Sequence, residues 1–493
     1  MQLADADSAN PEGFHVSDVR RAIQDYQRVL TDHPGYALND RVYYQLARAH
    51  QLLGETEPAI AALTQLGLRY PQSARAADAY FRSGEMLFAR SRFREAEGAY
   101  AGLLALGSEA PHYELAQYKY GWSLYKQSLH DRAAEVFLAV LDRDLPAGTL
   151  EDATSAIAAV ARDKQERAQD ALRVTAMSFA ALGGGPAVNA HFERSPKASR
   201  METLIYSALG EALLEKDRYT DAAGTYIAFI ARHPAHARAP EFQTRAIAAY
   251  GRGGFKEQAI QAQETYATRY APDSAYWASR TPDPAVMAQV RQHLDELGRY
   301  HQASAQQTTA LPARQATYLK AAGWYRRTLD LFPQDPKAAD TSLLLADALL
   351  EGGRVKDAAA QYAYTAYELP GHARAPVAAL ASVQAWQRLV RETEGTPVQA
   401  ETRRSSIAAA LRLAEAFPAH PQRTQVLMAA AEDQYVLGEL DAAVVTAERV
   451  LQAQATPLLR RGALGIVADA RFVQKKFPEA EAAYTQLLQL PAP

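Results

Sequence analysis

The stretch METLIYSALGEALLEKDRYTDAAGTYIAFIARHP, residues 201–234, carries the pattern that decides the fold. Gly210 is followed by Ala222 twelve positions later and by Tyr226 four positions beyond that, and Pro234 closes the stretch. Apolar residues on both sides of the short polar turn EKDRY follow helical spacing. The stretch therefore predicts two antiparallel helices, because a small residue on each helix lets the two backbones approach closely.

The same grid of a small, a second small and a large residue recurs along the chain, often with units 37 residues apart. The further copies are Ala47, Ala59, Leu63; Gly84, Ala96, Tyr100; Gly121, Ala133, Phe137; Ala346, Ala358, Tyr362; Ala431, Ala443, Ala447; and Ala468, Ala480, Tyr484. Prolines are expected to end the second helices, at Pro34, Pro71, Pro234, Pro333, Pro370 and Pro418. Segments 148–200, 273–336 and 371–420 fit the grid poorly, so we expect divergent helical pairs and bends there.

This pattern resembles the tetratricopeptide repeat family, whose signature places small, aromatic and proline residues at these offsets. The resemblance implies an all-α, right-handed superhelical solenoid of about ten antiparallel helix pairs. The expected organisation is a flexible N-terminal segment (1–16), N-terminal repeats with an aromatic groove (17–147), a divergent pair with a Gly-rich linker (148–200), central repeats (201–272), a second divergent pair (273–336) and C-terminal repeats (337–493).

The linkers after the closing prolines, as in LPGHARAPVAALA (369–381), look like the subclass of these repeats common in bacterial envelope proteins. The resemblance to periplasmic, outer-membrane-associated lipoproteins implies a periplasmic location. The lipid-attachment cysteine of such lipoproteins is absent, so tethering to the outer membrane would need residues outside this chain. The end of the chain directly after a second helix raises the expectation of a truncated fragment or of a further repeat beyond Pro493.

Composition excludes several classes of function. The 53 Lys and Arg residues nearly balance 56 Asp and Glu residues, so no basic field attracts nucleic acid. No stretch approaches the roughly 20 consecutive apolar residues that span a bilayer. The absence of cysteine excludes thiol catalysis, disulfides and thiolate metal sites.

Motifs that carry catalysis are missing as well, so the sequence predicts no enzyme, no cofactor and no metal site. The 12 histidines form no His-Glu-x-x-His pattern. The pair His233 and His236 flanks a proline in a polar turn, and solvated surface positions explain His293 and His301 as well as a site does. Glycines at 251–255 lie where a turn between helices belongs, rather than in a phosphate-binding loop.

A partner segment is expected to bind the concave face, which first helices line in such solenoids. In three N-terminal repeats this face is unusually aromatic, and Tyr and Trp are enriched in interface hot spots. The predicted partner-binding residues are Tyr44, Arg48, Phe81, Phe88, Tyr118, Trp122, Tyr125 and Lys126. With one Arg and no Asn on this face, a carboxylate clamp of the kind known in chaperone-binding relatives is not expected.

Alternatives stay open at this point. The rings of Phe81, Tyr118 and Trp122 could pack between neighbouring repeats instead of binding a partner. The main interpretation is a non-enzymatic interaction scaffold of the bacterial cell envelope with protein partners. The alternatives are a cytoplasmic regulatory or sensor module that binds a peptide or small ligand, and an enzyme hidden in segment 273–336.

Overall fold

The computed structural model describes residues 15–148, 153–195, 200–369 and 371–490, and within these residues it contains helices and no β-strand. The predicted all-α fold is therefore confirmed. None of the described helices is both long and apolar enough to cross a membrane. The expected flexible segment 1–16 lies almost entirely outside the described residues, and so does the closing Pro370.

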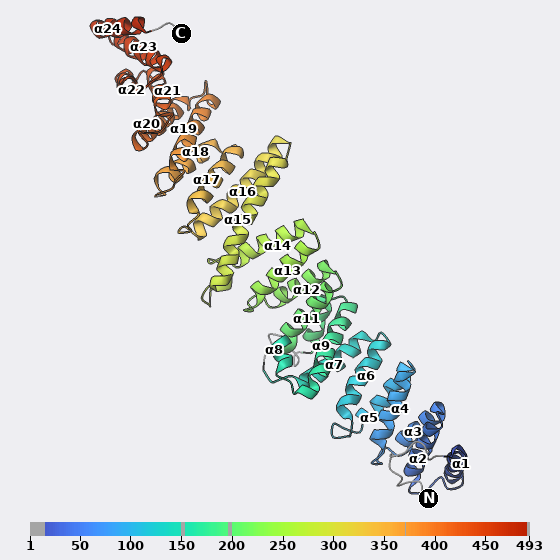
Figure 1. The fold of residues 1–493 in the computed structure, drawn as a ribbon. Coiled ribbons are helices and arrows are strands. Elements are labelled where there is room, and N and C mark those ends of the chain that lie inside the picture. Colours follow the sequence, from blue (N-terminus) through green and yellow to red (C-terminus); the bar gives the residue numbers. More distant parts are fainter. Residues whose placement is uncertain (1–14, 149–152, 196–199, 370, 491–493) are drawn as a thin grey trace. The chain divides into compact units, whose positions relative to one another are not determined.

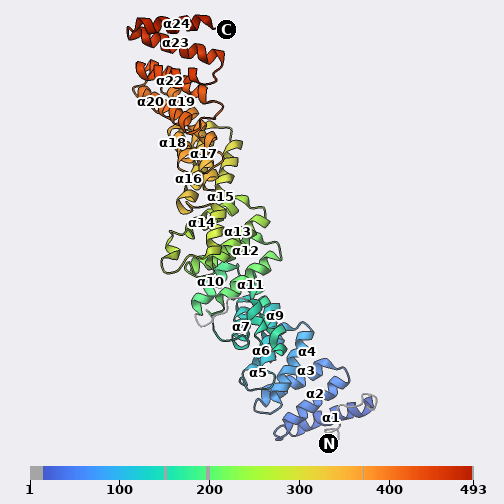
Figure 2. The same ribbon diagram turned by 60° about the vertical axis from the view of Figure 1, so that its left-hand side comes forward.

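Two compact units divide the chain, Met1–Ala262 and Gln263–Pro493. In the first unit, α3, α5, α7 and α12 each pack between the first helix of their own pair and that of the next pair, whereas α10 packs mainly on α12 (Figures 1 and 2). The helices are α1 (Val16–Asp32), α2 (Asn39–Leu52), α3 (Thr56–Arg69), α4 (Ala76–Ala89), α5 (Phe93–Leu104), α6 (Tyr113–Lys126), α7 (His130–Asp144), α8 (Ala153–Ala158), α9 (Arg162–Ala181), α10 (Gly185–Arg194), α11 (Glu202–Leu214), α12 (Tyr219–Arg232) and α13 (Ala239–Arg252), followed by α14 (Lys256–Arg269), which contains the boundary.

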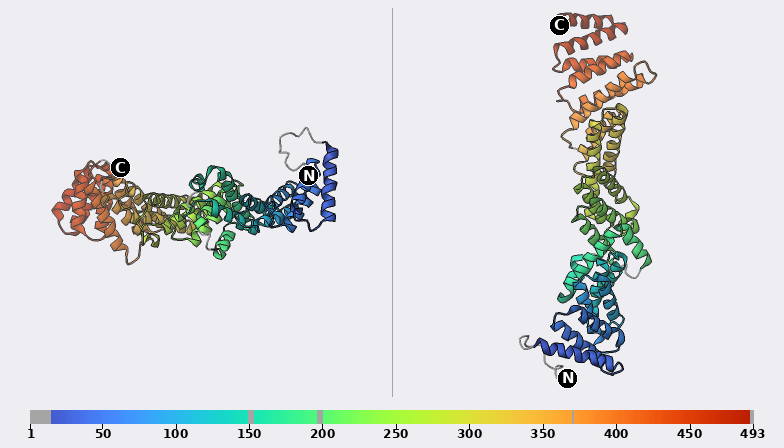
Figure 3. Two further views of the ribbon diagram at one scale, coloured as in Figure 1. Left: turned by 90° about the horizontal axis from the view of Figure 1, so that it is seen from below. Right: turned by 90° about the vertical axis from the view of Figure 1, so that its right-hand side faces the viewer.

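The second unit has the same arrangement of helix pairs, and each helix from α17 to α24 packs against the next one along the chain (Figure 3, right). Its elements after α14 are the short 3₁₀ helix η3 (Ala275–Trp277) and the helices α15 (Pro284–Gln307), α16 (Leu311–Leu331), α17 (Ala338–Glu351), α18 (Val355–Tyr367), α19 (Ala375–Glu392), α20 (Gln399–Ala416), α21 (Arg423–Val436), α22 (Leu440–Gln452), α23 (Pro457–Val473) and α24 (Phe477–Gln489).

The grid residues form the core of each pair. A Cβ atom on Gly84 would lie 2.6 Å from the ring of Tyr100, and one on Gly210 would lie 2.3 Å from the ring of Tyr226. The small residue is thus required by the ring that packs on it, since overpacking a core costs about 1–3 kcal/mol. All grid residues are buried except Tyr484 of the last pair, which is 36% exposed.

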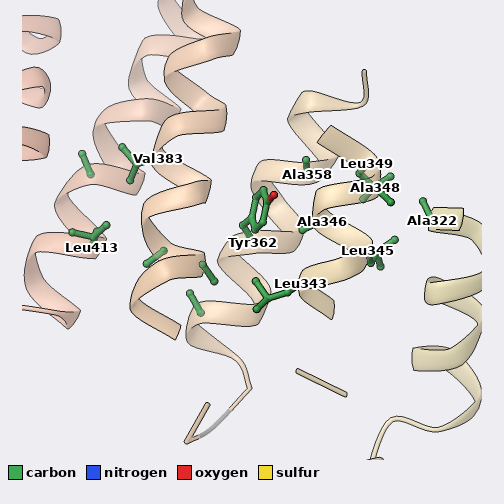
Figure 4. Packing of buried hydrophobic residues seen from close by; sticks show 14 of the residues in the cluster. Ala322, Leu343, Leu345, Ala346, Ala348, Leu349, Ala358, Tyr362, Val383 and Leu413 are labelled. Atoms are coloured by element: carbon green, nitrogen blue, oxygen red, sulfur yellow. The ribbon is translucent and has the colours of Figure 1, made fainter. Parts of the chain in front are cut away.

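The core of the second unit shows the same packing in detail (Figure 4). Ala346 on α17 and Ala358 on α18 are fully buried, and the ring of Tyr362 lies between the two helices. Leu343 and Val383 belong to the same buried cluster, which runs from α16 to α21. Each repeat therefore shares its core with the next one.

Prolines mark the helix ends as predicted. Five helices end two residues before a proline: α1, α3, α12, α16 and α20. A proline disfavours the helical conformation of the residue before it, so these helices stop there.

Segment 148–200 contains a repeat that the sequence grid did not reveal. Ala176 on α9, and Val188 and Phe192 on α10, lie at the grid offsets and are all buried. Ala176 precedes Gly210 by 34 residues, the usual spacing of the tetratricopeptide family. The larger Val188 at the second small position had hidden this copy.

The Gly-rich stretch 183–186 forms a packed turn between α9 and α10. A Cβ atom on Gly185 would lie 2.7 Å from the Cβ of Ala228 and 2.9 Å from the Cα of Thr225. Glycine is thus required here by the close approach of this turn to α12, and the two preceding glycines have positive φ angles.

Two other poorly fitting segments are lengthened repeats. A Cβ atom on Gly298 of α15 would lie 2.4 Å from the ring of Tyr325 on α16, although these residues are 27 positions apart instead of 16. Val383 and Ala410 are likewise 27 positions apart and share one core cluster. In the first case the extra residues are divided between the two helices, since α15 has 24 residues and α16 has 21.

Candidate protein-binding site

The predicted aromatic residues lie on α2, α4 and α6, the first helices of three successive repeats. We call Tyr44, Phe81, Phe88, Tyr118, Trp122 and Tyr125 the aromatic row. All six side chains are partly exposed, so each presents some ring surface to solvent while its remainder packs on the protein. The row is continued by residues of α9, the first helix of the repeat hidden in segment 148–200.

Tyr44 joins the first two of these repeats. Its hydroxyl donates to Asp78 Oδ2 at 2.8 Å and accepts a hydrogen bond from Arg82 Nη1 at 3.1 Å. Burial, followed by the hydrogen bond to Asp78, raises the pKa of Tyr44 above its usual value. The guanidinium groups of Arg75 and Arg82 lie 6.0 and 5.8 Å from the ring centre. Arg48, one turn further along α2, is exposed.

Phe81 and Phe88 on α4 contact the following repeat. Phe81 stacks on the imidazole of His112 with ring centres 4.8 Å apart. Phe88 meets Phe93 edge to face at 5.2 Å, and Lys119 Nζ lies 5.2 Å from its ring centre. Both rings thus support the packing between repeats and also keep part of their surface open.

Asp170 of α9 organises the end of the row on α6. Tyr118 donates its hydroxyl to Asp170 Oδ2 at 2.5 Å, and Trp122 Nε1 donates to the same oxygen at 3.0 Å. Burial raises the pKa of Tyr118 to about 12, with the hydrogen bond to Asp170 as the next cause. The third partner of this carboxylate is the guanidinium of Arg173.

The indole of Trp122 lies between two cations. Lys126 Nζ is 5.6 Å and the Arg173 guanidinium carbon is 5.8 Å from the ring centre, both within the range of cation–π attraction. Tyr125 packs edge to face on the same ring at 5.6 Å. These contacts limit the freedom of the side chains, so a partner that binds them would lose little conformational entropy in ordering them.

A cavity of about 510 Å³ adjoins the end of the row, between α8, α9 and α11. Arg173 belongs to both places, because it lines the cavity and also lies over Trp122. We call this cavity the α8 pocket. Its volume is typical of ligand pockets, which range from about 300 to 1,000 Å³.

The structure brings all eight predicted residues onto successive first helices of one unit. Phe81, Tyr118 and Trp122 contact residues of the next repeat, as the alternative interpretation expected. Their role in binding stays a prediction. Sequence reasoning missed Asp170, Arg173 and the α8 pocket. The small-to-large offsets from Ala176 to Phe192 could have revealed that α9 is a first helix.

The prediction that His293 and His301 on α15 occupy solvated surface positions is wrong. His293 and His301 are 8% and 9% exposed, and thus not at solvated positions. His301 Nε2 lies 3.2 Å from Glu264 Oε1, and burial lowers the pKa of His293. Among the residues that the structure describes, no group of three metal-ligating side chains occurs.

His233 pairs with a buried carboxylate instead of lying free in its turn. Its Nε2 atom lies 2.5 Å from Glu202 Oε2, which also accepts a hydrogen bond from Arg232 at 2.9 Å. These contacts link the end of α12 to the start of α11 and account for His233 without a metal.

Comparison with known proteins identifies the repeats. Family models described as tetratricopeptide repeats match residues 16–80, 84–149 and 313–379, and the third match begins inside segment 273–336. No curated protein matches the chain.

Similar solved structures include a human IFIT1 dimer with m7Gppp-AAAA, at 13% identity over 99% of this chain and 97% of that chain, with a TM-score of 0.22. Another is the P58(IPK) TPR domain, at 13% identity over 92% of this chain and 99% of that chain, with a TM-score of 0.21. From the three family-model matches and the helix pairs described above, we conclude that the chain contains tetratricopeptide repeats.

Proposed function

We propose that this protein is a non-enzymatic interaction scaffold of the bacterial cell envelope that binds a segment of a partner protein along the aromatic row. Tetratricopeptide repeats indicate a protein-interaction scaffold and protein partners in general. The choice of the aromatic row, the envelope location and the type of partner are our own inferences.

The observation that carries the proposal is the alignment of six partly exposed rings on three successive first helices. Packing alone does not require aromatic residues at these positions, because the repeat of α17 and α18 has Leu343 and Leu350 where that of α4 and α5 has Phe81 and Phe88. Large rigid rings bury much area at little entropic cost, which is why they dominate interface hot spots.

The envelope location is supported by the repeat spacing. Successive units lie 37 residues apart in much of the chain, and their proline-led linkers resemble those of periplasmic repeat proteins. Fractionation of bacterial cells that express the native gene tests this part. Recovery with periplasmic or outer-membrane markers is expected, and recovery with cytoplasmic markers would exclude the envelope role.

Binding is tested by cross-linking capture from envelope extract. The native chain is compared with a Trp122→Ala and Tyr125→Ala double variant, both checked by circular dichroism for helix content. We expect the double variant to lose the partner that the native chain captures.

The control for capture is Phe472→Ala on α23, which removes a more exposed ring, 55% accessible, from a first helix of the other unit. This variant should capture the partner as well as the native chain does. Equal capture by all three proteins would place the binding surface elsewhere and contradict the proposed site.

A further inference from the structure

An insertion builds the α8 pocket. From Gly121 on α6 to Ala176 on α9 the chain takes 55 residues, whereas most neighbouring repeats are separated by 34 or 37. The additional residues include α8, which packs against α9 and α11 (Figure 1). Both of these are first helices, so α8 covers the face that continues the aromatic row.

Specific contacts hold the insertion in place. At its start, Arg200 Nη1 donates to the carbonyl of Pro146 at 2.6 Å, and Nη2 donates to the carbonyl of Asp142 at 2.8 Å. At its end, Gln165 Nε2 donates to the carbonyl of Val160 at 2.9 Å. Ala156 of α8 and Val160, two residues after its end, are buried, so this part of the insertion is docked through apolar contacts.

An open groove lies between the docked helix and the helices α9 and α11. Ile157 and Thr154 of α8 line one side of the α8 pocket, and Leu172 and Ala176 of α9 line another. Small side chains on α11, Ala208 and Ala212, complete the apolar walls. These walls suit an extended aliphatic chain.

The charge of the pocket is acidic. Glu211 on α11 and Glu215, the residue directly after this helix, lie four positions apart and both line the pocket. Glu211 also accepts a hydrogen bond from Arg245 at 3.2 Å. The one cationic lining residue, Arg173, is paired with Asp170 and lies over Trp122. Arg245 forms an ion pair with Glu211, and Arg173 forms one with Asp170. With these partners counted, Glu215 leaves one negative charge in excess beside the apolar walls.

We propose that the α8 pocket binds a Lys or Arg side chain of the partner segment, next to the residue of that segment that packs on Trp122. The aliphatic stem would contact Ile157 and Ala212, and the cationic group would pair with Glu215 and share Glu211 with Arg245. A long basic side chain combines these two properties. This inference rests on the proposed function, and it names the chemistry that the partner must carry.

The test begins with peptides selected on the immobilised full chain from a random 12-residue display library. We expect selected peptides to be enriched in Lys or Arg compared with the unselected library. One selected peptide is then synthesised with a fluorophore and measured by fluorescence anisotropy against the native chain. A Glu211→Gln and Glu215→Gln double variant should bind it at least tenfold more weakly.

Replacement of the key Arg in the peptide by neutral citrulline, or of a key Lys by norleucine, should weaken binding to a similar extent. The two losses should not add, because both remove the same ion pair. Ala212→Leu, which fills the pocket without changing its charge, should also weaken binding. Glu166→Gln, an exposed carboxylate on α9 outside the pocket lining, is the matched control and should bind like the native chain.

The outcomes separate this inference from the proposed function. Selected peptides without basic enrichment, or with equal affinity for the double glutamine variant, would exclude the pocket as a site for basic side chains. Loss of the same peptides on Trp122→Ala would then still support the aromatic row. Failure to select any peptide would count against both proposals.

Discussion

The repeat formed by α4 and α5 and the repeat formed by α17 and α18 share one core and differ in their faces. In the first, Tyr100 packs on Gly84 and donates its hydroxyl to Glu85 at 2.5 Å. In the second, Tyr362 packs near Ala346 and donates to Asp347. The same ring and the same following carboxylate thus occur in both units of the protein.

The positions of Phe81 and Phe88 on α4 correspond to those of Leu343 and Leu350 on α17, and the two repeats differ there in chemistry. Phe81 and Phe88 keep partly exposed rings on α4, whereas Leu343 on α17 is buried within the aliphatic core. Since the same helix pair forms with either set, its folding does not account for the aromatic residues. The difference teaches that the core of a repeat and its outer face respond to separate constraints.

The largest effect should come from the shared core. Tyr100→Ala and Tyr362→Ala each remove a buried ring, so each should lower the free energy of unfolding by about 3–5 kcal/mol. Urea unfolding measures the total loss, and hydrogen exchange localises it to the mutated repeat. A large loss for one variant with a negligible loss for the other would break the claim that the two cores are equivalent.

Substitutions in the aromatic row should lower the affinity for the partner more than they lower the free energy of unfolding. Trp122→Ala should weaken the binding free energy of the captured partner by about 2 kcal/mol or more, as removal of an interface hot spot does. Titration of the purified partner against both proteins measures this loss. Phe472→Ala provides the comparison in the second unit, and a loss of similar size there would mean that binding is not confined to the aromatic row.

Asp170 and Asp347 allow a sharper comparison of carboxylates. Asp170 accepts hydrogen bonds from Tyr118, Trp122 and Arg173, whereas Asp347 accepts one from Tyr362. Asp170→Asn should therefore cost about 1.5 kcal/mol of unfolding free energy, and Asp347→Asn less. Urea denaturation of both variants at neutral pH decides between this order and its reverse.

The smallest effect should appear at alkaline pH. Burial raises the pKa of Tyr118 and of Tyr325 to about 12 each, but Tyr118 donates to a carboxylate and Tyr325 to the neutral amide of Gln302. Because the folded pKa exceeds the unfolded value of 10, each ring's contribution to stability is complete below pH 10 and is lost as the pH rises towards 12.

Carbon-13 NMR of labelled tyrosines follows both titrations. Asp170→Asn should lower the pKa of Tyr118 and leave that of Tyr325 unchanged. An unchanged Tyr118 pKa in this variant would show that burial alone accounts for its shift.

Much of the fold could be predicted because a repeat core depends on residues close in sequence. Gly210 and Tyr226 are 16 positions apart on two helices joined by a short turn, and helical spacing together with the length of this turn places them face to face. The fixed offset failed for Gly298 and Tyr325, where both helices are longer, and for Val188, where a larger residue replaces the small one. A search with variable helix length would have found these pairs.

The sequence by itself determined the helix pairs, their proline-terminated ends and the aromatic residues of the first helices, since each follows from spacing within one repeat. Only the tertiary structure decided which groups meet across repeats. Tyr118 donates a hydrogen bond to Asp170, 52 residues away, and α8 forms a pocket together with α9 and α11. The packing of successive repeats brings these parts together across an insertion of irregular length. Local periodicity carries no information about such contacts, because it describes each helix pair and not the chain between them.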